Sequence, residues 1–272
     1  MTSFFKKKFI KSLTLLFLKQ LSRIISPLIN YLTEINFEKN MFRIQNDKWN
    51  IIPGDQNKIR ANSQELLKLS DKDLLNKFNQ FILEDKSNYR SEYRKKYILG
   101  KNYKKILDLG CGLGRDGIFL AERGFEVTFA DVIPSNIKLV EKICKLKKLN
   151  CKFKLIQSYE DYGSLGTFDL ILAMGSLHHM PKKVTKKIIQ IMFKNFESNK
   201  TKFLILSYPY KRWKNDGCLP YRFWGLRTDG GAPWTEYFTL DKILFIFSQN
   251  CELIDEYNYN DEFIYFYLTI KK

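Results

Sequence analysis

The sequence predicts an α/β fold in which a mostly parallel β-sheet is flanked by helices. From Lys104 to Lys272, short apolar segments alternate with longer segments of helical periodicity. Alternation of this kind is typical of parallel strands joined by crossover helices. Only a short polar segment separates the last two apolar segments, so we expect them to form an antiparallel hairpin that closes the sheet.

The expected elements follow one another in order along residues 104–272. Strands are expected over residues 106–109, 127–131, 153–156, 168–174, 203–207, 252–259 and 263–270. Helices are expected over residues 116–123 and 135–149, after Pro181, and over residues 240–248. Asn260 and Asp261 are the expected turn of the closing hairpin.

Residues 1–33 are predicted to form a basic amphipathic helix. They contain six Lys or Arg residues and no acidic residue. These charges leave uncharged runs far shorter than the roughly 20 residues that span a bilayer. At helical periodicity Phe5, Phe9 and Leu13 lie on one side, with Lys7 and Lys11 across from them. Such a helix suits peripheral contact with an anionic membrane. The alternatives are a helix that caps the following domain and one that mediates dimerisation.

Residues 34–103 are expected to form a connector and a helical lid. Scattered polar residues and Pro53-Gly54 make residues 37–61 suitable as a connector. From residue 62 onward the pattern is helical: Ser63 can cap one helix, and Ser70 begins a segment that resembles a capping box.

The composition narrows the class of protein. Lys and Arg number 46 against 29 Asp and Glu, which gives a net charge of +17. Most of the basic residues are lysines in a sequence also rich in Ile and Asn, a bias that A/T-rich coding would produce, so the charge is weak support for nucleic-acid binding. Five cysteines without a C-x-x-C pair argue against a disulfide framework and a structural zinc site. A reducing cytoplasm is therefore the expected location.

Alternate glycines directly follow the first expected strand, in the segment Asp108-Leu109-Gly110-Cys111-Gly112-Leu113-Gly114. Glycines so spaced let the chain turn tightly and let a ligand approach main-chain N–H groups at a helix N-terminus. Asp131 closes the second expected strand, where a carboxylate can accept both hydroxyls of a ribose. The acid before the glycines, Asp108, would repel a pyrophosphate and suits a cationic amine, which disfavours a dinucleotide.

On these residues, Lys104 to Lys272 resembles the class I S-adenosylmethionine-dependent methyltransferases, of the group that acts largely on small molecules. The resemblance implies a Rossmann-like, seven-stranded sheet with S-adenosylmethionine as the cofactor. It also implies that the glycines border the methionine and adenosine, that Asp108 lies near the amino group, and that Asp131 binds the ribose. After the third expected strand, Ser158 stands where the family commonly has Asp, and Tyr159 or its backbone is expected to cover the adenine. The expected cofactor-binding residues are Asp108, Gly110, Cys111, Gly112, Gly114, Asp131, Val132, Ser158, Tyr159 and Met174.

Both histidines of the chain, His178 and His179, follow the fourth expected strand. The resemblance implies that the end of this strand faces the methyl group. An oxygen acceptor would lose its proton to a nearby base, and His178, His179 and Glu236 are the candidate catalytic residues. The alternative for each histidine is a hydrogen-bonded structural role. No third ligand at recognisable spacing accompanies the pair, so no metal site is expected.

A long segment rich in aromatic and charged residues, residues 209–238, lies between the fifth strand and the next helix. We expect it to cover the acceptor, with aromatic rings against sugar or ring faces and Arg against a phosphate or carboxylate. The alternative is a hydrophobic cluster that only covers the sheet. The expected acceptor-binding residues are Tyr210, Arg212, Trp213, Arg227, Asp229, Trp234 and Tyr237.

The expected function is methyl transfer to the O or N atom of a small-molecule, glycan-like or lipid-linked acceptor. Ala173-Met174-Gly175-Ser176 stands where enzymes of this fold that methylate exocyclic base amines carry an Asn/Asp-Pro-Pro-aromatic motif. Nucleic acid is therefore the disfavoured acceptor. RNA methylation and a non-catalytic cofactor-binding scaffold are the alternatives.

Overall fold

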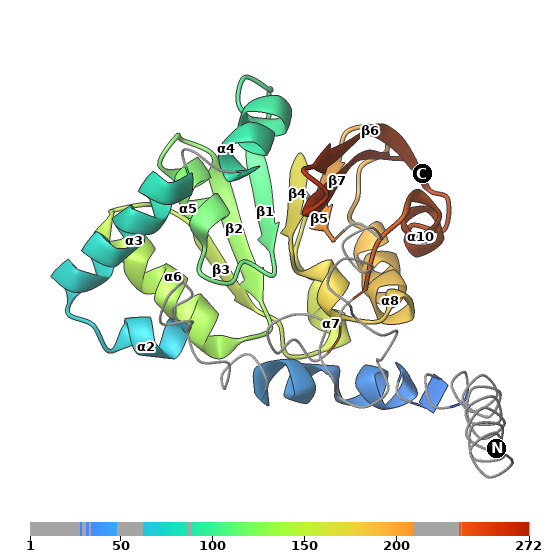
Figure 1. The fold of residues 1–272 in the computed structure, drawn as a ribbon, viewed down its shortest axis with the longest axis horizontal. Coiled ribbons are helices and arrows are strands. Elements are labelled where there is room, and N and C mark those ends of the chain that lie inside the picture. The colour runs from blue at the N-terminus through green and yellow to red at the C-terminus, as the bar shows by residue number, and fades with distance from the viewer. Residues whose placement is uncertain are drawn as a thin grey trace, which may run out of the picture.

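Seven strands form one sheet in the computed structural model, which describes residues 28, 31–32, 34–47, 62–85, 89–208, 234 and 236–271 (Figure 1). The strands are β1 (Lys105–Leu109), β2 (Glu126–Asp131), β3 (Lys152–Leu155), β4 (Leu170–Met174), β5 (Lys202–Ser207), β6 (Cys251–Tyr259) and β7 (Phe263–Ile270). Their order across the sheet is β3-β2-β1-β4-β5-β7-β6. The strands β1 to β5 are parallel, and β7 is antiparallel to both β5 and β6. The predicted mostly parallel sheet with a closing hairpin is confirmed.

The winding of the sheet reverses beside β1. From β1 the chain moves outward through β2 to β3, and it then returns to place β4 on the other side of β1. The connections that leave β1 and β4 therefore diverge toward opposite faces of the sheet. In open α/β sheets, ligands bind in the crevice that such a reversal leaves at the carboxyl ends of the strands.

The β6-β7 hairpin turns at the expected residues. Tyr259 pairs with Phe263, and the intervening Asn260 and Asp261 have φ angles of 51° and 56°. Asn and Asp tolerate this left-handed conformation better than most residues because their side chains can hydrogen-bond locally. The turn predicted from the sequence is confirmed.

Helices cover both faces of the sheet. One face packs against α2 (Ser63–Leu67), α3 (Asp71–Asp85), α4 (Tyr89–Tyr93), the π-helical turn η1 (Arg94–Ile98), α5 (Arg115–Ala121) and α6 (Pro134–Leu146). The other packs against α7 (Tyr159–Tyr162), α8 (Lys182–Phe193), α10 (Leu240–Ile246) and the helical residues 34–47, here named the N-terminal helix. A short 3₁₀ turn, η2 (Leu177–His179), follows β4. Among the described residues, no helix combines the length and the apolar character needed to cross a bilayer.

The N-terminal helix takes up the first part of the connector that was expected over residues 37–61; residues 48–61 lie outside the described residues. Phe37 and Met41 are buried in the core of the second face, and their i, i+4 spacing places both on one side of a helix. The helix also pairs with α8, where Lys187 Nζ lies 2.7 Å from Glu38 Oε1. The sequence expectation was wrong because polar residues separate these buried positions, so their helical spacing is weak as a pattern.

The expected helical lid is helical, and it packs directly on the sheet. The ring of Tyr93 lies 5.3 Å from that of Tyr265 in β7, and the ring of Tyr97 lies 5.2 Å from that of Tyr267. Both Tyr93 and Tyr97 are buried. Residues 62–98 therefore share one hydrophobic core with the sheet.

One of the two expected helix starts in this region is shifted by one residue. Asn62 caps α2, because its Oδ1 accepts a hydrogen bond from the backbone N–H of Gln64 at 2.8 Å. Ser63 lies inside the helix, and its hydroxyl bonds that of Ser135 at 2.8 Å. The capping interaction expected from Ser70 is present, since its Oγ accepts from the Asp73 backbone N–H.

Candidate functional site

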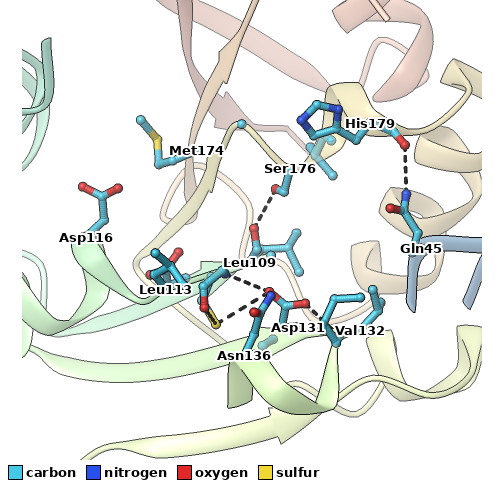
Figure 2. Close-up of a pocket in the computed structure, with 18 of the residues that line it drawn as sticks. Gln45, Leu109, Leu113, Asp116, Asp131, Val132, Asn136, Met174, Ser176 and His179 are labelled. Carbon is cyan, nitrogen blue, oxygen red and sulfur yellow. Dashed lines mark hydrogen bonds between the residues drawn. The ribbon is translucent and has the colours of Figure 1, made fainter. Parts of the chain in front are cut away.

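A cavity of about 470 Å³ opens at the carboxyl ends of β1, β2 and β4. The loops after these strands form one wall (Figure 2), and the other comes from the N-terminal helix, α2 and α4. The cavity therefore occupies the crevice beside β1. Its volume is within the range of about 300–1,000 Å³ that small-molecule pockets span.

The glycine loop after β1 lies directly against the loop after β4. Gly110 has a φ of 70°, and a Cβ on it would lie 2.3 Å from the Cβ of Ser176. The Ser176 hydroxyl also donates to the backbone oxygen of Leu109 at 2.7 Å (Figure 2). A side chain at position 110 would separate the two loops, so the close contact requires glycine.

The next two glycines have different surroundings. Gly112 lines the cavity with a φ of 53°, and a Cβ on it would meet no protein atom within 4 Å. Gly114 does not line the cavity: it is the N-cap of α5, and a Cβ on it would lie 2.7 Å from Val140 Cγ2. Gly112 therefore leaves room for a ligand, whereas Gly114 lets α5 pack against α6.

Asp131, at the end of β2, is held by surrounding N–H groups. Its Oδ1 accepts from the Ile133 backbone at 2.8 Å, and its Oδ2 accepts from the Gly112 backbone at 2.8 Å and from Asn136 Nδ2 at 3.2 Å (Figure 2). Burial raises the pKa of Asp131 above its ordinary value, and these hydrogen bonds act in the opposite direction. The carboxylate is thus fixed at the cavity wall, where it can accept hydrogen bonds from ligand hydroxyls.

Asp108, near the end of β1, is buried and also lines the cavity. Its Oδ2 accepts from the Gly117 backbone N–H at 3.0 Å. Burial and, to a smaller degree, the nearby Asp116 raise the pKa of Asp108 to about 7. A cationic ligand group beside it would favour the charged carboxylate. Asp108 is therefore suited to an ammonium group.

A cluster of charges on α4, η1 and α5 was not expected from the sequence. Asp116 forms ion pairs with Arg90 and Arg94 and accepts a hydrogen bond from Tyr93. Although burial raises the pKa of Asp116, the two guanidinium groups outweigh this effect and hold it below its ordinary value. Arg90 and Asp116 both line the cavity. The guanidinium group of Arg90 at the cavity wall suits a ligand carboxylate.

The two histidines occupy different positions. His179 lines the cavity, its Nδ1 lies 3.3 Å from the backbone oxygen of Trp234, and its own backbone oxygen accepts from Gln45 Nε2 at 2.8 Å (Figure 2). His178 is buried behind the lining, with its ring 4.1 Å from that of His179 and 4.5 Å from that of Tyr208. The structure brings only His179 to the cavity wall.

Glu236 is buried but does not line the cavity. Its Oε1 lies 2.6 Å from Lys242 Nζ, and its Oε2 accepts from Trp234 Nε1 at 3.3 Å. Its backbone N–H donates to the backbone oxygen of His178 at 2.7 Å. These contacts fix the segment after residue 234 against η2, and the proton-accepting role expected of Glu236 stays a prediction.

Ser158 and Tyr159 also lie outside the cavity lining. Ser158 caps α7 in a capping box with Asp161. The Tyr159 hydroxyl donates to the backbone oxygen of Glu38 at 3.0 Å, which directs its ring toward the N-terminal helix. Other apolar residues line the cavity near these positions, namely Ile156, Tyr162 and Met41.

Apart from Gly114, the remaining cofactor residues expected from the sequence are brought together. Asp108, Gly110, Cys111, Gly112, Asp131, Val132 and Met174 all line the one cavity. Of the expected acceptor residues, Trp234 and Tyr237 are buried and do not line it. The others lie outside the described residues: Tyr210, Arg212, Trp213, Arg227 and Asp229.

Several lining residues were missed by sequence reasoning. They come from the N-terminal helix, from α2 and α4, and from the chain just after β5: Met41, Gln45, Asn62, Ser63, Tyr89, Arg90 and Tyr208. No local pattern links them to the glycine loop, because only tertiary packing brings them there. Asn136 was also missed, although its place in the first turn of α6, five residues after Asp131, is a usable signal.

The described part of the chain contains no group of three or more His, Cys, Asp or Glu residues arranged to hold a metal ion. The cavity instead presents three carboxylates, two arginines, a glycine-lined loop and apolar side chains. These groups suit an organic ligand with cationic, hydroxyl and carboxylate groups.

Comparison with known protein sequences agrees with this geometry. Residues 106–198 match a family model described as a methyltransferase domain. Over 76 residues, 28% of this chain and 30% of the relative, the sequence is 34% identical to ubiquinone biosynthesis O-methyltransferase of Methylocella silvestris. Over 96 residues, 34% of this chain and 28% of the relative, it is 29% identical to the chloroplastic tocopherol O-methyltransferase of Arabidopsis thaliana. The match thus spans less than a third of each relative.

Solved structures share the fold. An S-adenosylmethionine-dependent methyltransferase from Clostridium acetobutylicum superposes with a TM-score of 0.53 at 15% identity, over 72% of this chain and 99% of the other. Another, from Anabaena variabilis, superposes with a TM-score of 0.51 at 14% identity, over 71% and 92% of the two chains. Residues 106–198 thus match a methyltransferase domain, and the described part of the chain has the fold of the S-adenosylmethionine-dependent methyltransferases.

Proposed function

We propose that this chain transfers a methyl group from S-adenosylmethionine to an O or N atom of a small, ring-bearing acceptor. The observation that carries the proposal is that Asp108, the glycine loop and Asp131 border one cavity together with His179 and Tyr208. The first three suit the cofactor, and the last two provide an adjoining polar and aromatic wall. Sugar, glycan-like and lipid-linked molecules are the candidate acceptors.

The lining fits the chemical groups of the cofactor. Asp108 would hold the amino group, Asp131 the ribose hydroxyls, and Arg90 the carboxylate. The apolar side chains Met41 and Tyr162 would contact the adenine. When bound, the cofactor supplies an electrophilic methyl group on a sulfonium.

The protein contributes mainly by positioning the acceptor and excluding water. Methyl transfer needs the attacking atom held about 3–3.5 Å from the methyl carbon, and enclosure by loops and helices restricts competing water. Gln45, which reaches from the N-terminal helix to the backbone of His179, helps to hold that wall in place. An amine acceptor needs little more than this positioning.

An oxygen acceptor also needs its proton removed, and we propose His179 for this step. A carbonyl oxygen only accepts hydrogen bonds, so the contact with the Trp234 oxygen favours the tautomer with the proton on Nδ1. Nε2 then carries the lone pair that can accept a proton. The names of the two sequence relatives, both O-methyltransferases, support an oxygen acceptor.

Aromatic side chains at the cavity support an acceptor that contains a ring. Tyr89 and Tyr208 both line the cavity, and their rings lie 4.5 and 5.9 Å from that of Phe263. Aromatic faces of this kind pack well against sugar or aromatic rings.

The reducing cytoplasm expected from the cysteine pattern stays a prediction.

Calorimetric titration of S-adenosylmethionine and S-adenosylhomocysteine into the full chain tests whether the chain binds the proposed cofactor. We expect micromolar binding that Asp131→Asn weakens by about 10- to 150-fold, the loss of roughly 1.5–3 kcal/mol typical of a hydrogen bond to a charged group. Asp161→Asn is the matched control, since Asp161 is a half-buried carboxylate after the neighbouring strand and lies outside the cavity lining. A folded chain that binds neither ligand would refute the proposed function.

An assay with labelled methyl groups tests whether the chain transfers them to a small acceptor. Fractionated small molecules and lipid extracts would be incubated with the chain and labelled cofactor. We expect label in a small-molecule or lipid fraction, reduced in His179→Ala if the acceptor atom is oxygen. Label found only in RNA would instead identify a nucleic-acid methyltransferase.

A further inference from the structure

Exposed apolar side chains gather in the helical region that precedes the N-terminal helix. Leu28, Tyr31 and Leu32 are 59%, 54% and 54% exposed. Helical spacing places positions 28, 31 and 32 on the same side. Large apolar residues are rarely so exposed elsewhere among the described residues, where only Leu83, Phe245 and Ile254 join them.

The solvent side of the neighbouring helix α8 carries four lysines. Lys183 and Lys187 form ion pairs with Glu34 and Glu38 of the N-terminal helix. Lys182 and Lys186 form no ion pair within the described part of the chain. Their Nζ atoms lie 5.2 and 4.2 Å from the ring centre of Phe245 in α10.

These two groups of residues form one continuous surface. Lys183 Nζ lies 5.6 Å from the ring centre of Tyr31, so α8 joins the exposed apolar residues to Phe245, which is itself 39% exposed. The N-terminal helix, blue in Figure 1, runs beside α8 there, as its ion pairs require. We name this the basic apolar surface; it consists of Leu28, Tyr31, Leu32, Lys182, Lys183, Lys186 and Phe245.

We propose that the basic apolar surface binds the anionic surface of a lipid bilayer. Its lysines complement lipid phosphates and carboxylates, each surface-near lysine contributing about 1 kcal/mol of attraction. Its leucines and aromatic rings suit the boundary between headgroups and acyl chains. A nucleic acid would use the lysines but gives exposed leucines no apolar phase to enter, so the combination favours a bilayer.

This surface lies close to the cavity along the N-terminal helix. Glu34 contacts Lys183 of the surface, and Met41, seven residues later, lines the cavity. Seven residues of helix span about 10 Å. A chain docked through this surface would therefore hold its cavity near the bilayer, where a lipid-linked acceptor is found.

Sedimentation of the full chain with lipid vesicles tests the proposal. The vesicles would contain phosphatidylcholine alone or mixed with phosphatidylserine. We expect binding only to the mixed vesicles, weakened about 30-fold or more by Lys182→Glu/Lys186→Glu, because two surface lysines are lost. Leu28→Ser/Leu32→Ser should reduce the binding that survives high salt, where the lysine contribution is screened.

Lys95→Glu/Lys101→Glu is the matched control, since it makes the same change in net charge at two exposed lysines beside α4, away from α8 (Figure 1). We expect this control to bind vesicles nearly as the unaltered chain does. Equal weakening in the two lysine variants would overturn the proposal, as would sedimentation with neutral vesicles alone. The proposal would also fail if Lys182→Glu/Lys186→Glu weakened RNA binding in a gel-shift assay but left vesicle binding unchanged in the sedimentation assay.

Discussion

Two buried carboxylates, Asp108 and Asp131, line the same cavity but differ in what holds them. Asp131 accepts hydrogen bonds from two backbone N–H groups and from Asn136. Within the described part of the chain, Asp108 accepts only one hydrogen bond, from the Gly117 backbone N–H. The charged residue that affects its pKa most is another acid, Asp116, which raises it. The first is therefore organised before a ligand arrives, whereas the charge on the second depends on the ligand.

The pH dependence of cofactor affinity should report this difference. The free protein holds a proton on Asp108 below its pKa of about 7, and an ammonium group must displace that proton. Affinity for S-adenosylhomocysteine should thus be constant well above pH 7 and fall toward tenfold per pH unit below it. Calorimetry across this range measures the slope.

The Asp108→Asn variant provides the control for that experiment. It should bind more weakly at high pH, because it lacks the charge, and its affinity should change little between the two sides of pH 7. An unchanged slope in this variant would assign the pH dependence to another group.

The glycine loop illustrates how neighbouring positions in one element can differ. Ala at position 112 is destabilised by roughly 1–2 kcal/mol because of the left-handed backbone, but its Cβ would contact no protein atom. Ala at position 114 has the same backbone strain, and its Cβ would also overlap Val140, which adds about 1–3 kcal/mol to the loss of stability.

We therefore expect different effects from Gly112→Ala and Gly114→Ala. Gly112→Ala should lower S-adenosylhomocysteine affinity at least about tenfold, since its methyl group enters the cavity, with the smaller loss of stability. Gly114→Ala should lose about 2–5 kcal/mol of unfolding free energy. Urea unfolding and calorimetry measure the two quantities. Similar changes in both variants would contradict the separate roles assigned to these glycines.

The link between α5 and the helices before β1 depends on Asp116. Replacing it by Asn leaves the buried Arg94 without its carboxylate, which typically costs about 3–5 kcal/mol. Urea unfolding of Asp116→Asn should show a loss of this size. Glu122→Gln, which breaks the more exposed pair with Lys147, should cost under about 1 kcal/mol. A loss for Asp116→Asn no larger than this would show that the cluster is not a structural link.

Local sequence predicted the elements that carry their own pattern. The unit from β1 through the glycine loop to Asp131 was identified because strand, glycines and helix follow each other within one short stretch. Ser158 and Tyr159 were placed by the same logic and do not line the cavity. There the capping of α7 and a contact with the N-terminal helix determine the side-chain directions.

At the scale of the whole molecule, the cavity joins elements that are distant in sequence. Met41 comes from the layer on one face of the sheet, and Tyr89 and Arg90 come from the layer on the other. No periodicity within either segment signals this meeting, because it follows from how both layers pack around the loops after β1 and β4. The wall opposite the glycine loop could therefore be known only from the fold.

Because both helical layers line one cavity, a bound ligand should stabilise the molecule as a unit. A ligand that binds only the folded chain adds about 2.7 kcal/mol at 100 times its Kd. For a domain of this size we expect S-adenosylhomocysteine at that concentration to raise the Tm by about 5–10 °C. At the same ligand concentration, Asp131→Asn should lose about half of this shift or more and Asp161→Asn should keep it, as scanning calorimetry measures. Equal shifts in the two variants would place the ligand away from Asp131, and a transition that splits in two on binding would show that the layers unfold separately.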